Sequence, residues 1–245
     1  GQLNSQGEIV ESDIAANISR ILERIREKAS LSGRKATDIR LMAVTKTVDD
    51  ARVREALQAG IKLIGENYVQ ETARKKVLLE QRGSPLEWHM VGRLQTNKAK
   101  YAVKLFDMIH SVDSLELARE LDKRSKAMEC VTKVLIEANT GGERTKSGVP
   151  FSRAQELIIA AAALENISIE GLMTIPPWFP DPEKARPYFA ALRELKEKIE
   201  KADIPRVHMR ELSMGMTDDY EVAIEEGATI VRIGRGIFGE RVAKK

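Results

Sequence analysis

The 245-residue sequence contains few of the side chains that build disulfides and metal sites, with one cysteine and three histidines. Because Cys130 is alone, an intramolecular disulfide and a structural zinc site of the cysteine type are both excluded. The cysteine and the histidines show no spacing that is typical of a metal site, so we expect none. The low cysteine content fits a protein of the reducing cytoplasm, and we predict that location.

The sequence also lacks an excess of charge of one sign and a long apolar run. It has 40 Lys plus Arg against 37 Asp plus Glu, so the net charge of +3 gives no reason to expect nucleic acid or an anionic membrane as a partner. The longest apolar run, residues 157–164, is far shorter than a membrane span. We interpret two basic clusters, Arg74-Lys75-Lys76 and 98–100, as solvated helix faces.

The first residues lack the basic flank and the apolar stretch of a signal peptide. Because the sequence begins with Gly1 instead of Met, we expect residues 1–8 to be a flexible end that was processed or added. Residues 9–245 have a length and a hydrophobic content that suit one domain with a large core. We therefore predict a single domain over 9–245.

Eight short apolar runs have the composition of β-strands that are covered on both faces, as in a parallel sheet. The predicted strands are 39–45, 62–65, 87–91, 108–112, 132–138, 168–173, 209–214 and 229–233. Segments with helical spacing lie between or after them, at 50–59, 67–81, 96–104, 114–126, 152–164, 182–201 and 218–226. A further amphipathic helix, 12–30, precedes the first strand.

Eight strand–helix units in a chain of this length predict a single (β/α)₈ TIM barrel with an extra N-terminal helix. The alternative is a doubly wound open sheet. Such sheets often carry a Gly-x-Gly-x-x-Gly sequence after the first strand, and this chain has none there. Residues 234–239 match the glycine spacing but lie after the last strand, so the pattern favours the barrel.

The active sites of such barrels lie at the carboxyl ends of the strands, and Lys46 directly follows the first predicted strand. Burial in the barrel mouth would lower the pKa of this lysine and make its amine nucleophilic enough to form a Schiff base. The alternative is a lysine that extends from the strand end into solvent.

The loops after the seventh and eighth predicted strands contain Ser213, Gly215, Gly234 and Gly236 near two helix starts. TIM barrels often bind phosphate at this place, on backbone N–H groups at a helix N-terminus. Serine and glycine are also common in ordinary turns, which is the alternative interpretation. Two adjacent loops of this kind opposite a strand-end lysine favour a phosphorylated ligand.

Arg232 shares one strand face with Gly234 because strand side chains alternate. A buried arginine needs a partner. It would either form an internal salt bridge with Glu66 or Glu137 or act as a fixed donor that faces a ligand ring.

His89 lies inside the third predicted strand, where it would serve as an acid or base or as a core histidine with internal partners. We favour the core interpretation. We interpret His110 and His208 as structural.

The strand ends together resemble the pyridoxal phosphate homeostasis protein family (YggS-type), which is related to the barrel of alanine racemase. The first matching stretches are Ala43-Val-Thr-Lys46-Thr and Gly65-Glu-Asn-Tyr-Val-Gln-Glu71. The others are 88–98, 110–113, 139–148, 171–174, 212–218 and 231–239. The resemblance runs in order from about residue 12 to 240.

The resemblance implies a barrel that binds pyridoxal 5′-phosphate (PLP) as an internal aldimine on Lys46. It implies that Ser213, Gly234 and Arg235 hold the phosphate, the last two through backbone N–H groups, and that Arg232 faces the pyridine nitrogen. It assigns four more residues to the cofactor site, namely Asn67, His89, Met173 and Gly215. The family usually has Gly-Thr-Ala where this chain has Gly234-Arg235-Gly236, so an arginine charge would replace a threonine hydroxyl.

The implied function is intracellular PLP homeostasis, in which the protein buffers or delivers the cofactor without an established catalytic turnover. The partners would be PLP and PLP-requiring apoenzymes, and we expect a monomer. An arginine is never a base in practice, so it would keep the ring nitrogen unprotonated and disfavour transamination.

Two enzymatic alternatives stay open. A weak amino-acid racemase would use Lys46 as one base but needs a second acid or base, and we expect no room for a further domain after the last strand. A Schiff-base aldolase for phosphosugars would instead need carboxylates around the lysine.

Overall fold

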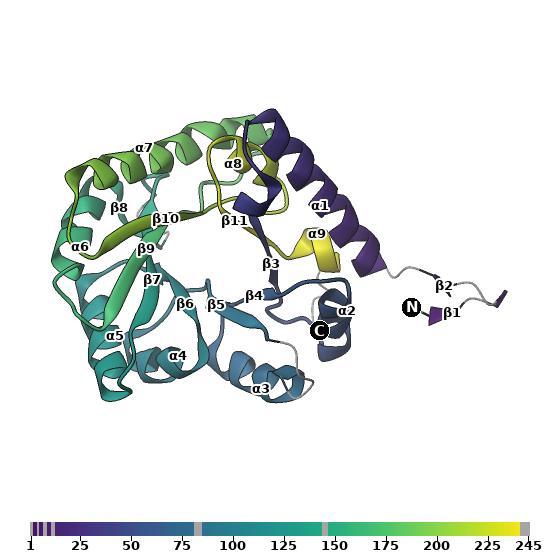
Figure 1. Cartoon of the computed structure of the whole chain (residues 1–245), viewed down its shortest axis with the longest axis horizontal. Helices are drawn as coiled ribbons and strands as arrows, with labels where there is room; N and C mark the ends of the chain where they lie inside the picture. Colours follow the sequence, from purple (N-terminus) through teal and green to yellow (C-terminus); the bar gives the residue numbers. More distant parts are fainter. Residues whose placement is uncertain are drawn as a thin grey trace.

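The structure, a computed structural model, describes residues 2–3, 5–6, 9–10, 13–80, 85–143 and 147–240. Eight parallel strands form a closed ring in the order β6-β5-β4-β3-β11-β10-β9-β7, and the pairing of β6 with β7 closes it (Figure 1). Helices surround the ring (Figure 1). The predicted TIM barrel is therefore confirmed, and the alternative of an open sheet is wrong.

All eight predicted strands are present, with ends within two residues of those expected. The barrel strands are β3 (Arg40–Val44), β4 (Leu63–Glu66), β5 (Glu87–Met90), β6 (Met108–Val112), β7 (Thr132–Asn139), β9 (Ile167–Met173), β10 (Val207–Ser213) and β11 (Ile230–Ile233). The sequence did not predict three short strands. They are β1 (Gln2–Leu3) and β2 (Ile9–Val10), which pair with each other, and β8 (Val149–Pro150), which pairs in parallel with the end of β7.

The helices also follow the prediction, and several of them begin with a 3-10 turn. The α-helices are α1 (Asp13–Leu31), α2 (Asp50–Gln58), α3 (Val69–Glu80), α4 (Ala99–Leu105), α5 (Leu115–Ala127), α6 (Ala154–Ala161), α7 (Arg186–Ala202), α8 (Tyr220–Glu225) and α9 (Arg235–Phe238). The 3-10 turns are η1 (Ala36–Asp38), η2 (Thr96–Lys98), η3 (Phe151–Arg153) and η4 (Pro182–Ala185). The extra helix α1 lies beside α2, α8 and α9, and so covers the junction between the first and last units of the barrel (Figure 1).

Alternation along the strands separates two apolar regions. On β3, Leu41 and Ala43 belong to the large core between the strands and the helices. Met42 and Val44 belong to a small separate cluster with Leu63, Val91 and Ile230. Successive side chains of a strand point to opposite faces, so the small cluster fills the interior of the barrel. A second small cluster of Met108, Leu135 and Met173 lies apart from the large core in the same way.

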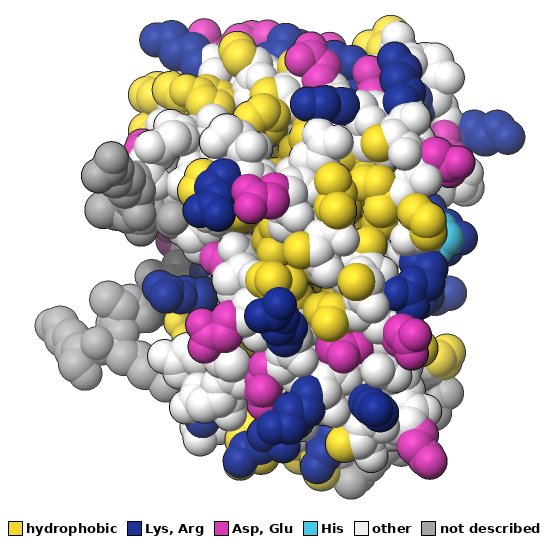
Figure 2. Space-filling view, turned by 90° about the vertical axis from the view of Figure 1, so that its left-hand side faces the viewer, with side chains coloured by type: hydrophobic (Ala, Val, Ile, Leu, Met, Phe, Trp, Pro, Cys, Tyr) yellow, Lys and Arg dark blue, Asp and Glu magenta, His cyan; other side chains and the backbone are white. Residues whose placement is uncertain are grey.

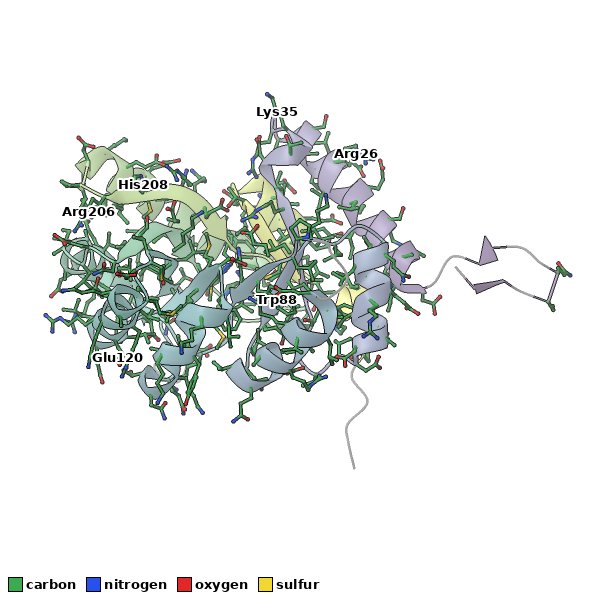
Figure 3. The ribbon with its side chains drawn as sticks, turned by 60° about the horizontal axis from the view of Figure 1, so that its bottom comes forward. Arg26, Lys35, Trp88, Glu120, Arg206 and His208 are labelled. Carbon is green, nitrogen blue, oxygen red and sulfur yellow. The ribbon has the colours of Figure 1, made fainter. Side chains whose placement is uncertain are left out.

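One face of the outer surface carries side chains of mixed types (Figure 2). On the face that is nearest α5 and α6, apolar side chains lie among interspersed acidic and basic ones, without a region of one charge (Figure 2). Figure 3 shows Arg26 and Lys35 on the outside, on or next to α1, while Trp88 lies within the body of the molecule. Trp88 is completely buried.

Candidate functional site

A cavity of about 1000 Å³ opens at the carboxyl ends of β3, β4 and β11. Small-molecule sites usually have volumes of about 300–1,000 Å³, so this cavity is large enough for a cofactor. Its wall contains five of the nine site residues predicted from the sequence, namely Lys46, Asn67, Arg232, Gly234 and Arg235. The chain places these residues at the end of the barrel where enzymes of this fold bind their ligands.

Lys46 lies on the cavity wall because of the alternation along β3. Met42 and Val44 face the interior of the barrel, so the next residue of the same alternation is Lys46. The backbone turns sharply after it, since Thr47 has a φ of 62° although it is β-branched. The N–H of Thr47 donates to Glu71 Oε1 at 2.7 Å, which holds this unusual conformation in place.

A buried lysine, Lys75, stabilises the turn that follows β3. Lys75 Nζ lies 2.8 Å from both Glu66 Oε1 and Glu71 Oε1, and it also donates to the carbonyl of Thr45. Its side chain is completely buried, so the interpretation of Arg74-Lys75-Lys76 as a solvated face is wrong for Lys75. The spacing of Glu71 and Lys75, four residues apart in a predicted helix, is a signal that could have identified the pair.

Lys75, Glu66 and Glu71 form a cluster in which burial has the largest effect on the pKa of Glu66. Burial raises the pKa of Glu66, and the nearby charge and hydrogen bond of Lys75 oppose that shift. The hydroxyl of Thr45 donates to Glu66 Oε1. The other oxygen, Oε2, is buried and has no hydrogen-bond partner within the described ranges. The cluster therefore joins the start of α3 to the residue before Lys46.

Asn67 brings a polar side chain to the wall from the end of β4. Its Oδ1 is buried and has no hydrogen-bond partner in the part of the chain that the structure describes. Buried polar atoms are nearly always paired in native proteins, so this oxygen fits a donor group on a ligand. Gly92 permits the position of Asn67, because a Cβ on Gly92 would fall 2.7 Å from the Cα of Asn67.

Arg232 points its guanidinium across the floor of the cavity and is almost completely buried. Nη1 donates to Ser213 Oγ at 2.7 Å, and Nη2 donates to the carbonyl of Thr174 at 3.0 Å. Burial lowers the pKa of Arg232 to about 10, so the group stays charged at neutral pH.

The salt bridge predicted as an alternative for Arg232 is wrong. Glu66 is paired with Lys75, and Glu137 accepts a hydrogen bond of 2.7 Å from the hydroxyl of Ser147. Arg232 therefore has neutral partners, and its charge faces the cavity without a direct carboxylate partner among the described residues.

The loop after β11 forms a narrow edge of the cavity. A Cβ on Gly234 would lie 3.4 Å from the Val44 carbonyl oxygen, so this residue packs beside the end of β3. Helix α9 begins directly after Gly234. The first N–H groups of a helix have no partner within the helix, and one of them, that of Gly236, donates to Thr217 Oγ1 at 3.1 Å.

The rim of the cavity is held by Asp218. Its Oδ2 accepts from Trp178 Nε1 at 3.0 Å, and its Oδ1 accepts from Arg235 Nη2 at 2.5 Å. These hydrogen bonds, first that of Trp178 and then that of Arg235, lower the pKa of Asp218. Arg235 Nε also lies 3.7 Å from Glu240. The guanidinium of Arg235 therefore belongs to the rim.

The other four predicted site residues lie behind the wall. Ser213 and His89 are completely buried and are hydrogen-bonded to other side chains, and Met173 lies in an interior apolar cluster. Gly215 has a φ of 98°, and its carbonyl accepts from the backbone N–H of Arg232 at 2.9 Å. These residues support the wall, and His89 has the internal partners that are expected of a core histidine.

The described residues contain neither a membrane-spanning helix nor a cluster of metal ligands. None of their helices has the length and apolar character needed to cross a membrane. Within the same ranges, no group of three or more His, Cys, Asp or Glu side chains is arranged to hold a metal ion.

Comparison with known proteins shows which family this chain resembles. The profile of the alanine racemase N-terminal domain matches residues 15–242. The pyridoxal phosphate homeostasis protein of Aquifex aeolicus (strain VF5) is 47% identical over 224 residues, which are 91% of this chain and 96% of that protein.

Solved structures agree with the sequence relatives. PipY of Synechococcus elongatus PCC7942 with PLP bound has a TM-score of 0.78 and 35% identity, and the match covers 89% of this chain and 100% of that one. The alanine racemase of Clostridium difficile 630 has a TM-score of 0.67 at 17% identity, and the match covers 94% of this chain and 58% of the racemase. The similarity to the racemase concerns the fold alone.

Proposed function

Because this chain belongs to the alanine racemase N-terminal domain family and, within it, to the pyridoxal phosphate homeostasis proteins, we propose that it binds PLP and acts in PLP homeostasis. It would hold the cofactor, buffer its free concentration and deliver it. The observation that carries this proposal is the placement of Lys46 and Arg232 in one cavity at the carboxyl end of the barrel. The amine of Lys46 can react with an aldehyde, and the guanidinium of Arg232 can donate a hydrogen bond to a ring nitrogen.

The roles of the wall residues follow from their chemistry. PLP supplies an aldehyde that condenses with an amine and a ring that withdraws electrons. Lys46 is the amine that would bond to the aldehyde carbon. Arg232 only donates hydrogen bonds, so it would bind the ring nitrogen in its unprotonated form. Asn67 would pair its buried Oδ1 with a polar group of the ligand.

The phosphate would bind at the edge formed by the loop after β11. We assign it to the backbone N–H groups of Gly234 and Arg235, which lie at the start of α9. Ser213, which the resemblance assigns to the phosphate, is buried behind the wall and hydrogen-bonded to Arg232, and we assign to it the support of that arginine. Gly215, Met173 and His89 complete the site from behind the wall.

The composition of the wall favours storage and delivery over racemisation. A racemase needs an acid or base on each face of its substrate. Among the described residues, the cavity wall includes neither a tyrosine nor a histidine that could serve opposite Lys46. The family relationship to PLP homeostasis proteins supports PLP over a phosphosugar.

The wider setting of the protein is part of the same proposal. We infer that residues 9–245 act as one monomeric domain and that the protein works in the cytoplasm. Its protein partners would be PLP-requiring apoenzymes. The open mouth of the cavity supports exchange of the cofactor with such partners.

The test is an absorption spectrum of the purified protein with PLP, for the wild type, Lys46→Ala and Lys100→Ala. Lys100 is an exposed lysine of α4 and serves as the matched control. We expect a visible band in the wild type and in Lys100→Ala, loss of the band in Lys46→Ala, and a pyridoxyl group on Lys46 after borohydride reduction and peptide mapping. A wild type without the band, or with the group on another lysine, would contradict the proposal.

A second assay separates storage from catalysis. The loaded protein is incubated with an apoenzyme that requires PLP, and the recovered activity of that enzyme is measured. Formation of D-amino acids from L-amino acids is measured in parallel. Recovery without racemisation is the expected result, and steady production of D-amino acids would identify a racemase.

A further inference from the structure

A continuous hydrogen-bond chain of five side chains crosses the interior of the barrel. Glu87 Oε1 lies 2.8 Å from His89 Nε2, and His89 Nδ1 lies 2.8 Å from His110 Nε2. His110 Nδ1 lies 2.9 Å from Ser213 Oγ, to which Arg232 donates at 2.7 Å. Both histidines and Ser213 are completely buried, and Arg232 is nearly so, whereas Glu87 is 42% exposed.

The chain joins strands that face each other across the barrel. In the order of the ring, β5 is four strands away from β10, and β6 is four strands away from β11 (Figure 1). Glu87 is the first residue of β5, so it lies at the end of the barrel opposite the cavity. Arg232 lies on the cavity wall. The chain therefore connects solvent below the barrel with the proposed cofactor site above it.

The two ends of the chain determine where the protons lie. Arg232 can only donate hydrogen bonds. Glu87 is held at 2.8 Å by the guanidinium of Arg40, and the hydrogen bond from His89 and the charge of Arg40 lower its pKa to about 2. At neutral pH this carboxylate can only accept. Between these ends, every hydrogen bond must point from the arginine to the carboxylate.

The position of each proton between the two ends follows from the group next to it, starting at Glu87. Because Glu87 accepts, His89 carries its proton on Nε2, and its Nδ1 must accept from His110. A neutral His110 then carries its proton on Nε2, and its Nδ1 accepts the hydroxyl proton of Ser213. Burial lowers the pKa of both histidines, which favours these neutral forms. The opposite arrangement would require the Glu87 carboxylate to donate a proton that it does not have.

We propose that Glu87, His89, His110 and Ser213 are positioning residues that orient Arg232 in the cavity through a one-way hydrogen-bond chain, and that Glu87 sets its direction. The chain fixes Nη1 of the guanidinium from one side, while the carbonyl of Thr174 fixes Nη2. Two of the five N–H donors are used in this way, and the others remain for a ligand. The direction of the chain is a property of the protein itself, whereas its consequence for a ring nitrogen rests on the proposed function.

The test reads the proton positions directly in the protein without ligand. The ring nitrogens of ¹⁵N-labelled histidines report which nitrogen carries the proton, and the whole sequence has only three histidines to assign. The variant is Glu87→Gln, whose amide can donate or accept. The matched control is Glu170→Gln, because Glu170 also bonds an arginine, Arg210, and a side chain two residues away on its strand, Ser168.

The wild type and Glu170→Gln are expected to show neutral His89 and His110, both protonated on Nε2. In Glu87→Gln both rings are expected to populate the Nδ1-protonated form together, although His89 is the only one of the two rings that contacts residue 87. A role of Glu87 in packing alone would leave His110 unchanged. The proposal is overturned if His110 carries its proton on Nδ1 in the wild type, or if its signals do not respond to Glu87→Gln.

The same samples are titrated with PLP, and the affinity is read from the absorption band. We expect several-fold weaker binding in Glu87→Gln and unchanged binding in Glu170→Gln. Equal affinity in both variants would overturn the role of the chain in positioning Arg232. If the wild type binds no PLP, the proposed function fails, while the proton positions still decide the direction of the chain.

Discussion

The ammonium of Lys75 and the carboxylate of Glu66 lie 2.8 Å apart, and both side chains are completely buried beneath the turn that carries Lys46. Removing one partner of such a pair leaves an uncompensated buried charge, which typically costs about 3–5 kcal/mol. We expect Lys75→Met to lower the free energy of unfolding at neutral pH by that amount. The measurement is denaturant unfolding followed by circular dichroism.

The matched control is Lys76→Met, because Lys76 is the next residue and its pair with Glu80 at 3.6 Å is partly exposed. Exposed pairs contribute about 1 kcal/mol or less, and the hydrogen bond from Lys76 Nζ to the carbonyl of Leu105 contributes about 0.5–1.5 kcal/mol, so this variant should lose less stability than Lys75→Met. Equal losses of unfolding free energy in the two variants would show that the buried pair of Lys75 and Glu66 does not stabilise the turn.

The position of Asn67 depends on the missing side chain of Gly92. A Cβ there would lie 2.7 Å from the Cα and Cβ of Asn67, and these atoms cannot move without moving the end of β4. Gly92→Ala is expected to destabilise the fold by about 1–3 kcal/mol, as overpacking usually does, and to weaken PLP binding. Thermal unfolding and spectroscopic titration measure the two effects. An alanine variant with wild-type affinity would show that Asn67 does not contact the ligand.

The two tryptophans report on different regions. Trp88 is completely buried, and Trp178 is 69% exposed on the cavity rim. Iodide should therefore quench only the emission of Trp178, and PLP bound in the cavity should quench the same residue. In Trp178→Phe both effects are expected to disappear. Quenching by PLP that persists in this variant would place the ligand elsewhere.

The buried histidines predict a loss of stability in acid. Burial lowers the pKa of His89 and His110 in the folded protein, so the unfolded chain binds more protons once the pH falls below about 6.5. Their contribution is complete above that pH and is lost as the pH decreases, by up to about 1.4 kcal/mol per pH unit for each histidine. The charged groups that act on them are Glu87, Arg40, Asp107 and Arg232.

The measurement compares the pH dependence of unfolding in the wild type and in His110→Gln. Carboxylates with raised pKa values, such as Glu66, act in the opposite direction, but they are common to both proteins and cancel in the difference. We expect a shallower dependence in the variant. His208→Gln is the control, because His208 is exposed on the outside of the barrel (Figure 3). The prediction is wrong if His110→Gln and the wild type have parallel curves.

The fold could be predicted because its signals are local. Each of the eight strands is a short apolar run, and the strand ends follow directly from that list. Lys46, Asn67, Arg232 and Gly234 reach the cavity for the same reason, since each lies at or near the carboxyl end of a predicted strand. The rule that barrel sites lie at these ends then brings them together.

The supporting contacts could not be predicted because they join distant parts of the chain. His110 and Ser213 are 103 residues apart, and only the closure of the ring places them at hydrogen-bond distance. The basic cluster at 74–76 shows the same limit. Lys75 and Lys76 each have a glutamate four residues away, so this spacing alone does not indicate which lysine lies beneath the end of β3. The answer, Lys75, depends on how α3 packs.

The hydrogen bond between Trp178 and Asp218 at the rim bears on the residence time of a bound molecule and not on its affinity. Trp178 and Asp218 join two loops above the strand ends, and their hydrogen bond is exposed to solvent. If this contact is equally strong in the empty and the filled protein and opens only during passage, it slows entry and departure by the same factor. It changes the residence time and leaves the dissociation constant as it was. Under that condition, Trp178→Phe would change the rate at which the cofactor exchanges without altering the amount stored.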